Sequence, residues 1–139
     1  MSDKTKLMFV DDDTTFLEAQ VAFFGARGYE VRTAEGCEEA IALLANESPD
    51  MIFVDLMMEH SDSGFTLARR IRRDPRFENV PLVMLSGVAS VTGAGFAREQ
   101  DSLRSWSHLD EFVDKPVSER QLLAIVERRL SGVAEERRR

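Results

Sequence analysis

The stretch Met51-Ile52-Phe53-Val54-Asp55 decides the fold, because four consecutive apolar residues lead directly into a carboxylate. A strand that is apolar at every position is expected where helices cover both faces of a parallel sheet. The preceding Ser48-Pro49-Asp50 is a chain-breaking sequence. We therefore predict a buried central strand over residues 51–54, with Asp55 at its carboxyl end.

Strand-like and helix-like patterns alternate on both sides of this stretch, as is typical of successive βαβ units. The expected strands are residues 6–10, 29–33, 51–54, 80–86 and 111–114, with 29–33 at a sheet edge. The expected helices are one capped around residues 13–15 and ending at Gly28, then 38–46, 65–73, a weak one within 87–110, and a closing helix through Leu122, Val126, Leu130 and Val133. We predict a doubly wound α/β fold with right-handed crossovers.

Composition indicates one compact domain, since the chain has 139 residues, 43% of them apolar and 31% charged. We assign residues 1–139 to it, with a core of about 6–131 and a C-terminal tail over 132–139. No stretch resembles a signal peptide or a bilayer span, so we expect a cytoplasmic protein without membrane contact. Because Cys37 is the only cysteine, an internal disulfide is excluded.

Charge argues against direct nucleic-acid binding, because the net charge of −7 repels a phosphate backbone. Two basic runs, residues 69–73 and 137–139, are the possible exceptions. Neither has interleaved aromatic residues on which bases could stack. We interpret both runs as solvated surface.

Side chains that share a site in an open parallel sheet come from the carboxyl ends of its strands. The residues at these ends are Asp11, Asp12 and Asp13 after the first strand, Asp55, Ser86, and Lys115 after the fifth. Carboxylates brought together repel one another and require a compensating cation. Mg²⁺ fits this set of hard oxygen ligands, whereas zinc would want cysteines or histidines.

The same residues suit phosphoryl transfer. Asp55 can attack phosphorus as a carboxylate nucleophile, Lys115 can hold a phosphoryl oxygen, and the Ser86 hydroxyl can donate a hydrogen bond. Taken singly, such residues are more commonly helix caps, turn residues or solvated charges. Their coincidence at four strand ends favours the functional interpretation.

The sequence at this point resembles the receiver domain of two-component response regulators, from about residue 7 to residue 130. The resemblance rests on Phe9-Val10-Asp11-Asp12-Asp13, Thr33-Ala34 with Glu39-Ala40, Phe53-Val54-Asp55-Leu56-Met57-Met58, Met84-Leu85-Ser86-Gly87 and Asp114-Lys115-Pro116. It implies a flavodoxin-like five-stranded sheet with strand order 2-1-3-4-5.

The resemblance also implies the chemistry. Asp55 would accept a phosphoryl group from a histidine kinase or a histidine phosphotransfer protein. Mg²⁺ would be bound by Asp11, Asp12, Asp55 and the backbone carbonyl of Met57, and the Lys115–Pro116 peptide bond would be cis. The protein would then be a switch with at most slow self-dephosphorylation, rather than an enzyme.

Signalling in this family implies Ser86 and Phe112 as switch residues, and an output face formed by helix 4, strand 5 and helix 5. Only nine residues follow Leu130. We therefore expect a stand-alone receiver whose output is altered binding to another protein. Apolar Met57 and Val88 beside the expected site predict slow attack by water on the acyl phosphate.

Two segments depart from the family pattern. Glu59 stands where the family usually has a proline after the methionine of the phosphoacceptor loop, and Gly64 comes one residue late. The stretch between Ser86 and Lys115 is several residues longer than the family's usual spacing. Trp106 in the second segment is either a partner anchor or a residue buried under the loop.

Three alternatives remain. A receiver-like interaction module could work without phosphate. A metal-dependent phosphohydrolase would want a second acid where Met57 stands. A nucleotide or flavin binder would want a phosphate loop where the three aspartates stand.

Overall fold

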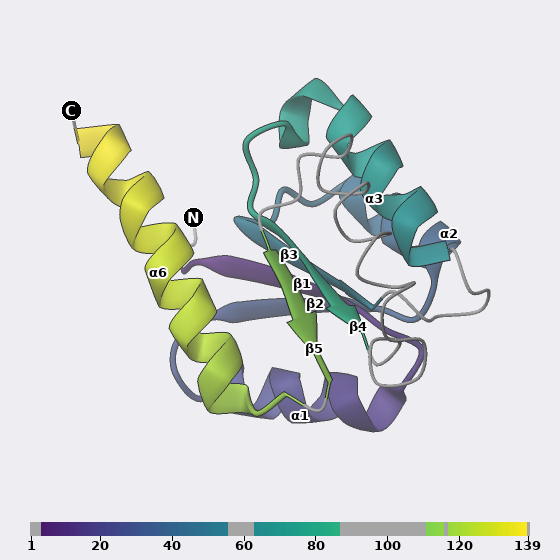
Figure 1. The fold of residues 1–139 in the computed structure, drawn as a ribbon, viewed down its shortest axis with the longest axis horizontal. Helices are drawn as coiled ribbons and strands as arrows, with labels where there is room; N and C mark the ends of the chain where they lie inside the picture. The colour runs from purple at the N-terminus through teal and green to yellow at the C-terminus, as the bar shows by residue number, and fades with distance from the viewer. Residues whose placement is uncertain (1–3, 56–62, 87–110, 116, 139) are drawn as a thin grey trace.

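The computed structural model describes residues 4–55, 63–86, 111–115 and 117–138. Its elements are β1 (Lys6–Val10), α1 (Thr14–Gly25), β2 (Glu30–Ala34), α2 (Cys37–Leu44), β3 (Met51–Asp55), α3 (Ser63–Arg73), the 3-10 helix η1 (Pro75–Phe77), β4 (Leu82–Ser86), β5 (Glu111–Asp114) and α6 (Glu119–Arg138). The five strands form one sheet in the order β2-β1-β3-β4-β5, and every neighbouring pair is parallel. The α/β fold and the strand order are those expected from the sequence (Figure 1).

Strand β3 lies at the centre of the sheet and is buried at all five positions. The edge strand β2 has only one fully buried residue, Ala34. This difference confirms the prediction that the apolar stretch is central and that the more polar second strand lies at an edge.

Alternate residues of the strands pack into two layers, because successive side chains of a strand point to opposite faces. Figure 1 shows α2 and α3 over one face and α1 and α6 over the other. The layer beneath α2 and α3 includes Met8, Val10, Ile52 and Val54. The layer beneath α1 and α6 includes Leu7, Phe9, Met51 and Phe53. In this second layer the rings of Phe9 and Phe53 stack with their centroids 4.6 Å apart.

Helix α1 begins where the sequence predicts, and the Asp13 carboxylate caps it by accepting a hydrogen bond from the Phe16 N–H at 3.2 Å. Its end differs from the prediction, because the helix stops at Gly25 and a turn follows. Gly28 has a φ of +90° in that turn, a conformation that glycine adopts without steric cost.

Strand β4 begins two residues later than predicted. The Val80 N–H donates to the Phe77 carbonyl of η1, a short helix that the sequence did not reveal. Pro81 still contributes to the sheet, because its carbonyl accepts a hydrogen bond from the Ile52 N–H at 3.0 Å.

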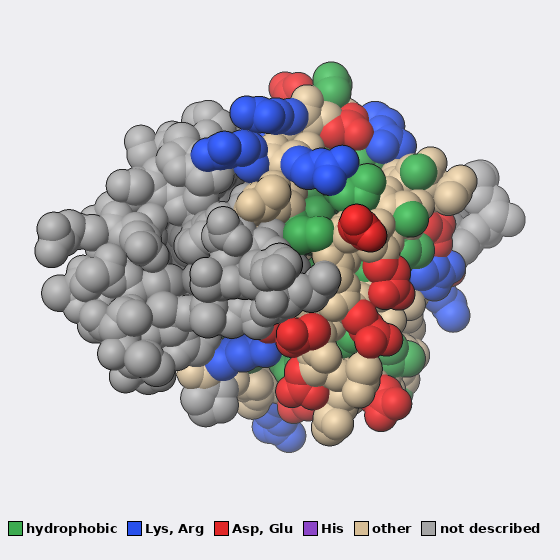
Figure 2. Space-filling model, turned by 90° about the vertical axis from the view of Figure 1, so that its right-hand side faces the viewer, with side chains coloured by type: hydrophobic (Ala, Val, Ile, Leu, Met, Phe, Trp, Pro, Cys, Tyr) green, Lys and Arg blue, Asp and Glu red, His purple; other side chains and the backbone are tan. Residues whose placement is uncertain are grey.

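The arginine run of α3 is partly structural. The Arg72 Nη1 atom donates to the carbonyls of Phe77 and Val80 at 2.9 and 2.7 Å, which ties α3 to the start of β4. Arg69, Arg70 and Arg73 are exposed, in agreement with a solvated face. Figure 2, which views the side lying at the right of Figure 1, shows several basic side chains in its upper part and several acidic ones lower down, with some of the other sign in each area.

An ion-pair network lies near the amino ends of β1 and β2. Lys6 Nζ is 3.1 Å from a Glu47 carboxylate oxygen and 3.5 Å from one of Glu30. Arg32 pairs with both of these glutamates as well. The network therefore joins two strands to the connection between α2 and β3.

Helix α6 continues to Arg138, so it runs through most of residues 132–139, where we expected a C-terminal tail. The division into core and tail stays a prediction. Alanine, glutamate and arginine dominate this stretch, and all three favour helix. The weak helix expected within 87–110 lies outside the described residues. Within the part of the chain that is described, no helix is both long and apolar enough to span a membrane.

Candidate functional site

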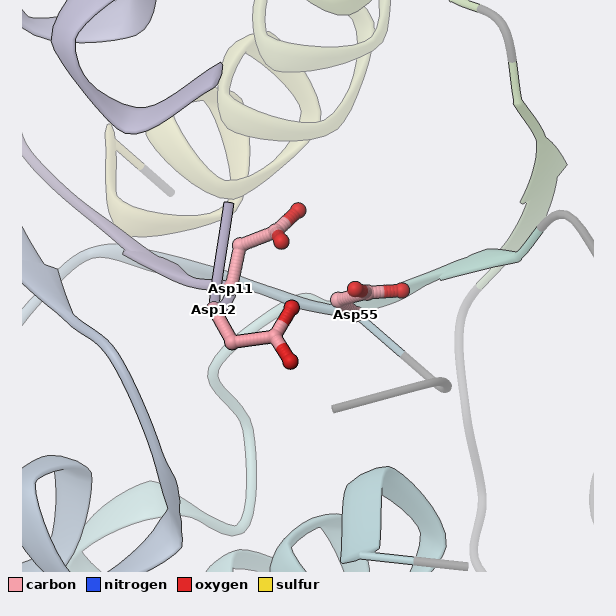
Figure 3. Close-up of side chains that lie close together, drawn as sticks. All are labelled: Asp11, Asp12 and Asp55. Carbon is pink, nitrogen blue, oxygen red and sulfur yellow. The ribbon is translucent and has the colours of Figure 1, made fainter. Parts of the chain in front are cut away.

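Three carboxylates lie together at the carboxyl ends of β1 and β3. Asp11 and Asp12 directly follow β1, and Asp55 is the last residue of β3. The two strands are parallel neighbours in which Val10 pairs with Val54, so their ends bring these residues to one place. One oxygen from each carboxylate lies within 4.8 Å of the others (Figure 3).

The three differ in their exposure. Asp11 and Asp55 are 1% and 5% exposed, whereas Asp12 is open to solvent. Asp11 is also held in place, because its Oδ1 accepts a hydrogen bond from the Asp13 N–H at 2.9 Å and its own N–H donates to the Ala34 carbonyl. The cluster thus combines two buried carboxylates with one that a solvated ion can reach.

Lys115, directly after β5, reaches this cluster. Its Nζ lies 2.7 Å from Asp11 Oδ2 and 3.7 Å from Asp55 Oδ2. The lysine side chain is 24% exposed. Three carboxylates and one ammonium leave a formal charge of −2, so the site has an excess of negative charge that a divalent cation would balance.

The oxygen positions fit Mg²⁺. Octahedral coordination at about 2.0–2.1 Å from the metal places ligand oxygens roughly 3 to 4 Å from one another. The carboxylate oxygens of Asp11, Asp12 and Asp55 lie within 4.8 Å of one another and meet this requirement after a small adjustment. Carboxylate oxygens are also the ligand type that this ion prefers.

Phe16, in the first turn of α1, was not among the site residues predicted from the sequence. Lys115 Nζ lies 4.6 Å from the centre of its ring. In the sequence Phe16 is one of several apolar residues of a helical stripe, and nothing there indicates contact with a lysine far along the chain. Its position just after the aspartate run places it near the site in the sequence, but does not indicate a role there.

The other predicted site residues are placed only in part. Ser86 ends β4, next to Leu85, which pairs with Asp55 across the sheet. Phe112 lies in β5 and pairs with Met84. The structure gives the backbone of Ser86 and Phe112 but not their side chains. Several predicted features fall outside the described residues: Met57, Glu59, Val88, Trp106 and the Lys115–Pro116 peptide bond.

Comparison with known proteins gives a match over most of the chain. A family model described as the response regulator receiver domain matches residues 7–127. The phosphate regulon transcriptional regulatory protein PhoB of Pseudomonas aeruginosa is 32% identical over 85% of the chain, which spans 48% of that protein. Protein PilG of the same species is 30% identical over 90% of the chain and 87% of its own length.

The first of the curated relatives is a DNA-binding dual master transcriptional regulator, RpaA of Synechocystis, at 30% identity. The chain spans about half the length of RpaA, as it does of PhoB. Among solved structures, a CheY-like receiver domain protein of Methanospirillum hungatei superposes with a TM-score of 0.82 at 24% identity. That match covers 96% of this chain and 99% of the other, and it shows the fold.

Proposed function

The chain belongs to the response regulator receiver domain family, and from this premise we propose that it is a phosphorylation-controlled switch with Asp55 as the acceptor. Receiver domains of two-component systems are phosphoacceptor switches rather than enzymes in the ordinary sense. The observation that carries the proposal is the grouping of Asp55 with Asp11, Asp12 and Lys115 at one end of the sheet.

Asp55 suits the role of nucleophile by its position. It ends the buried strand β3, so its backbone is fixed, and one of its carboxylate oxygens lies within 4.8 Å of an oxygen of Asp11 and one of Asp12. In the proposed step, one carboxylate oxygen forms a bond to phosphorus. The bond from phosphorus to the donor breaks, and the donor atom leaves with that electron pair.

Lys115 and Ser86 are proposed to bind the oxygens of the incoming group. The Lys115 ammonium already lies 3.7 Å from Asp55 Oδ2, so it can act as a point charge on a phosphoryl oxygen there. Ser86 ends the strand next to β3 and would supply a hydroxyl hydrogen bond. Phosphoryl transfer requires mainly this kind of positioning and charge stabilisation.

Mg²⁺ would be held by Asp11, Asp12 and Asp55, with the carbonyl of Met57 as the further ligand implied by the family. When bound, it neutralises charge that develops on the transferring oxygens. Asp11 would orient the set, since it is buried and accepts a backbone hydrogen bond.

A sensor histidine kinase or a histidine phosphotransfer protein is the proposed donor, because such proteins are the partners of receiver domains. The proposed output is a change in binding to another protein, with Ser86 and Phe112 as switch residues. It would use the face formed by the fourth helix, the fifth strand and the last helix. Of that face, the structure describes β5 and α6.

The acceptor is tested by intact mass after incubation with Mg²⁺ and a small acyl phosphate. The wild type is expected to gain one phosphoryl group, and Asp55→Asn none. Asp74→Asn is the matched control, because Asp74 is the carboxylate that caps η1 and pairs with Arg76 at 2.9 Å. It should be phosphorylated as the wild type is. An unmodified wild type, or equal addition to Asp55→Asn, would show that the proposal is wrong.

A further inference from the structure

We propose that Phe16 is a positioning residue for Lys115. Its ring holds the ammonium group beside Asp11 and Asp55, and keeps it there when a metal ion engages the carboxylates. The proposal concerns the same site and rests on the proposed role of Asp55 as acceptor.

Within the described part of the chain, the ammonium of Lys115 has three neighbours. Two are carboxylates, at 2.7 Å for Asp11 and 3.7 Å for Asp55, and the third is the face of the Phe16 ring at 4.6 Å from its centre. A cation within about 6 Å of a ring centre is attracted by the negative face of the ring. The ring therefore adds an uncharged partner to two charged ones.

The Phe16 ring is itself fixed. It meets the Phe9 ring edge to face, with centroids 6.4 Å apart, and packs against the core layer beneath α1 and α6. The backbone of Phe16 is held at both ends: its N–H donates to Asp13, and its carbonyl accepts from the Gln20 side chain at 3.2 Å. A ring held in this way can direct a flexible side chain.

The two kinds of partner respond differently to a metal ion. Mg²⁺ would bind the carboxylates of Asp11 and Asp55 and would repel the nearby ammonium. The lysine stem is flexible and its head is well hydrated, so without another partner it would turn toward solvent. Phe16 is not a metal ligand, and its attraction for the ammonium is therefore retained.

The contact is tested by NMR of the Lys115 Cε protons, because a ring beneath them shifts their resonances upfield. The shift is expected in the wild type and in Phe16→Tyr, with and without saturating Mg²⁺, and is expected to vanish in Phe16→Leu. Loss of the shift when Mg²⁺ is added to the wild type would overturn the proposal. An unchanged shift in Phe16→Leu would overturn it too.

The consequence is tested by the initial rate of phosphorylation from a limiting small acyl phosphate. Phe16→Leu should be slower by about fivefold, the factor that corresponds to about 1 kcal/mol of lost cation–π attraction. Phe16→Tyr should stay near the wild-type rate, because it keeps the aromatic ring. If Phe16 only filled space in the core, the rate would not depend on whether residue 16 is aromatic. Phe16→Met serves as a second aliphatic variant if Phe16→Leu does not fold.

Phe23→Leu is the matched control. Phe23 lies on the same helix, but the cation over its ring is a different one, the Arg27 guanidinium, 3.7 Å from the ring centre. Its rate should equal that of the wild type. Equal rates for the wild type and Phe16→Leu would contradict the proposal. If the wild type itself gains no phosphoryl group, the function proposed for Asp55 fails, and the NMR measurement alone decides whether Phe16 holds Lys115.

Discussion

At the scale of single residues, Gln20 is a polar side chain almost wholly removed from water. It is 1% exposed on α1, and its Nε2 donates to the Phe16 carbonyl at 3.2 Å. Its Oε1 is buried without a hydrogen-bond partner among the described residues. An unsatisfied buried acceptor costs roughly 1–3 kcal/mol. We therefore expect Gln20 to cost stability through its acceptor, although its amide N–H supports the helix turn that bears Phe16.

Replacing this glutamine by an apolar residue should stabilise the protein. We expect Gln20→Leu to raise the free energy of unfolding by about 1 kcal/mol, because the unpaired acceptor is removed. Urea denaturation followed by circular dichroism measures this change. Gln121→Leu is a control with the opposite expected sign, since Gln121 and Ser118 cap α6 by reciprocal hydrogen bonds. A loss of stability in Gln20→Leu would contradict the prediction.

The charged residues of the site could be predicted from the sequence because each stands at a strand end. Asp11, Asp12, Asp55 and Lys115 were all expected there, and the sheet brings them together. The roles assigned to them stay predictions. Phe16 could not be predicted, because its contact joins the first helix to the residue after the last strand, and its sequence pattern is that of an ordinary core residue.

At the scale of elements, all five strands were predicted, since apolar runs and chain breaks mark them clearly. The boundaries were less predictable because they depend on single hydrogen bonds. The bond from the Val80 N–H to the Phe77 carbonyl delays β4, and the turn through Gly28 follows an earlier end of α1. The continuation of α6 beyond residue 131 was not predicted, because the charged residues 135–139 are as typical of a solvated tail as of a helix.

The ion-pair network predicts how the stability of β1 and β2 depends on pH. Hydrogen bonds from Arg32 and Lys6 hold the pKa of the Glu47 carboxyl below its ordinary value of 4.5. A lowered pKa in the folded state means that the stabilisation is present above that ordinary value. This stabilisation is lost as the pH falls through the lowered pKa of Glu47 in the folded protein.

We therefore expect Glu47→Gln to be less stable than the wild type at neutral pH, with a difference that shrinks in acid below the ordinary carboxyl pKa. Urea denaturation at a series of pH values measures the two curves. Glu18→Gln, at an exposed position of α1, controls for the loss of one surface charge. If the difference in free energy of unfolding between the wild type and Glu47→Gln stays constant as the pH is lowered, the ion pairs do not stabilise the fold.

At the scale of the whole molecule, folding brings the negative charge of Asp55 to Asp11 and Asp12, from which it is distant in the sequence. Asp11 and Asp55 are buried and Asp12 lies beside them, so the folded protein has a carboxylate cluster that the unfolded chain lacks, and this cluster is where we propose that a cation binds. A ligand that binds only the folded state raises its stability by mass action. Metal binding should therefore be measurable as thermal stability.

We expect Mg²⁺ at about ten times its dissociation constant to raise the melting temperature by roughly 5 °C, which corresponds to about 1.4 kcal/mol. Differential scanning calorimetry measures the shift, with a sodium salt at equal ionic strength as the control. Asp12→Asn should reduce it, because one carboxylate ligand is lost. If Mg²⁺ raises the melting temperature of Asp12→Asn as much as that of the wild type, the ion binds at a site that does not include Asp12.

The ion-pair network at the amino ends of β1 and β2 lies the length of a strand from the carboxylate cluster, about 16 Å for five residues. That separation is about twice the distance over which physiological salt screens exposed charges. Substitutions in the ion-pair network are therefore expected to change stability while leaving the electrostatic potential at the carboxylate cluster almost unchanged. The two ends of the sheet can in this way vary separately, one set of residues for stability and another for the proposed phosphoryl chemistry.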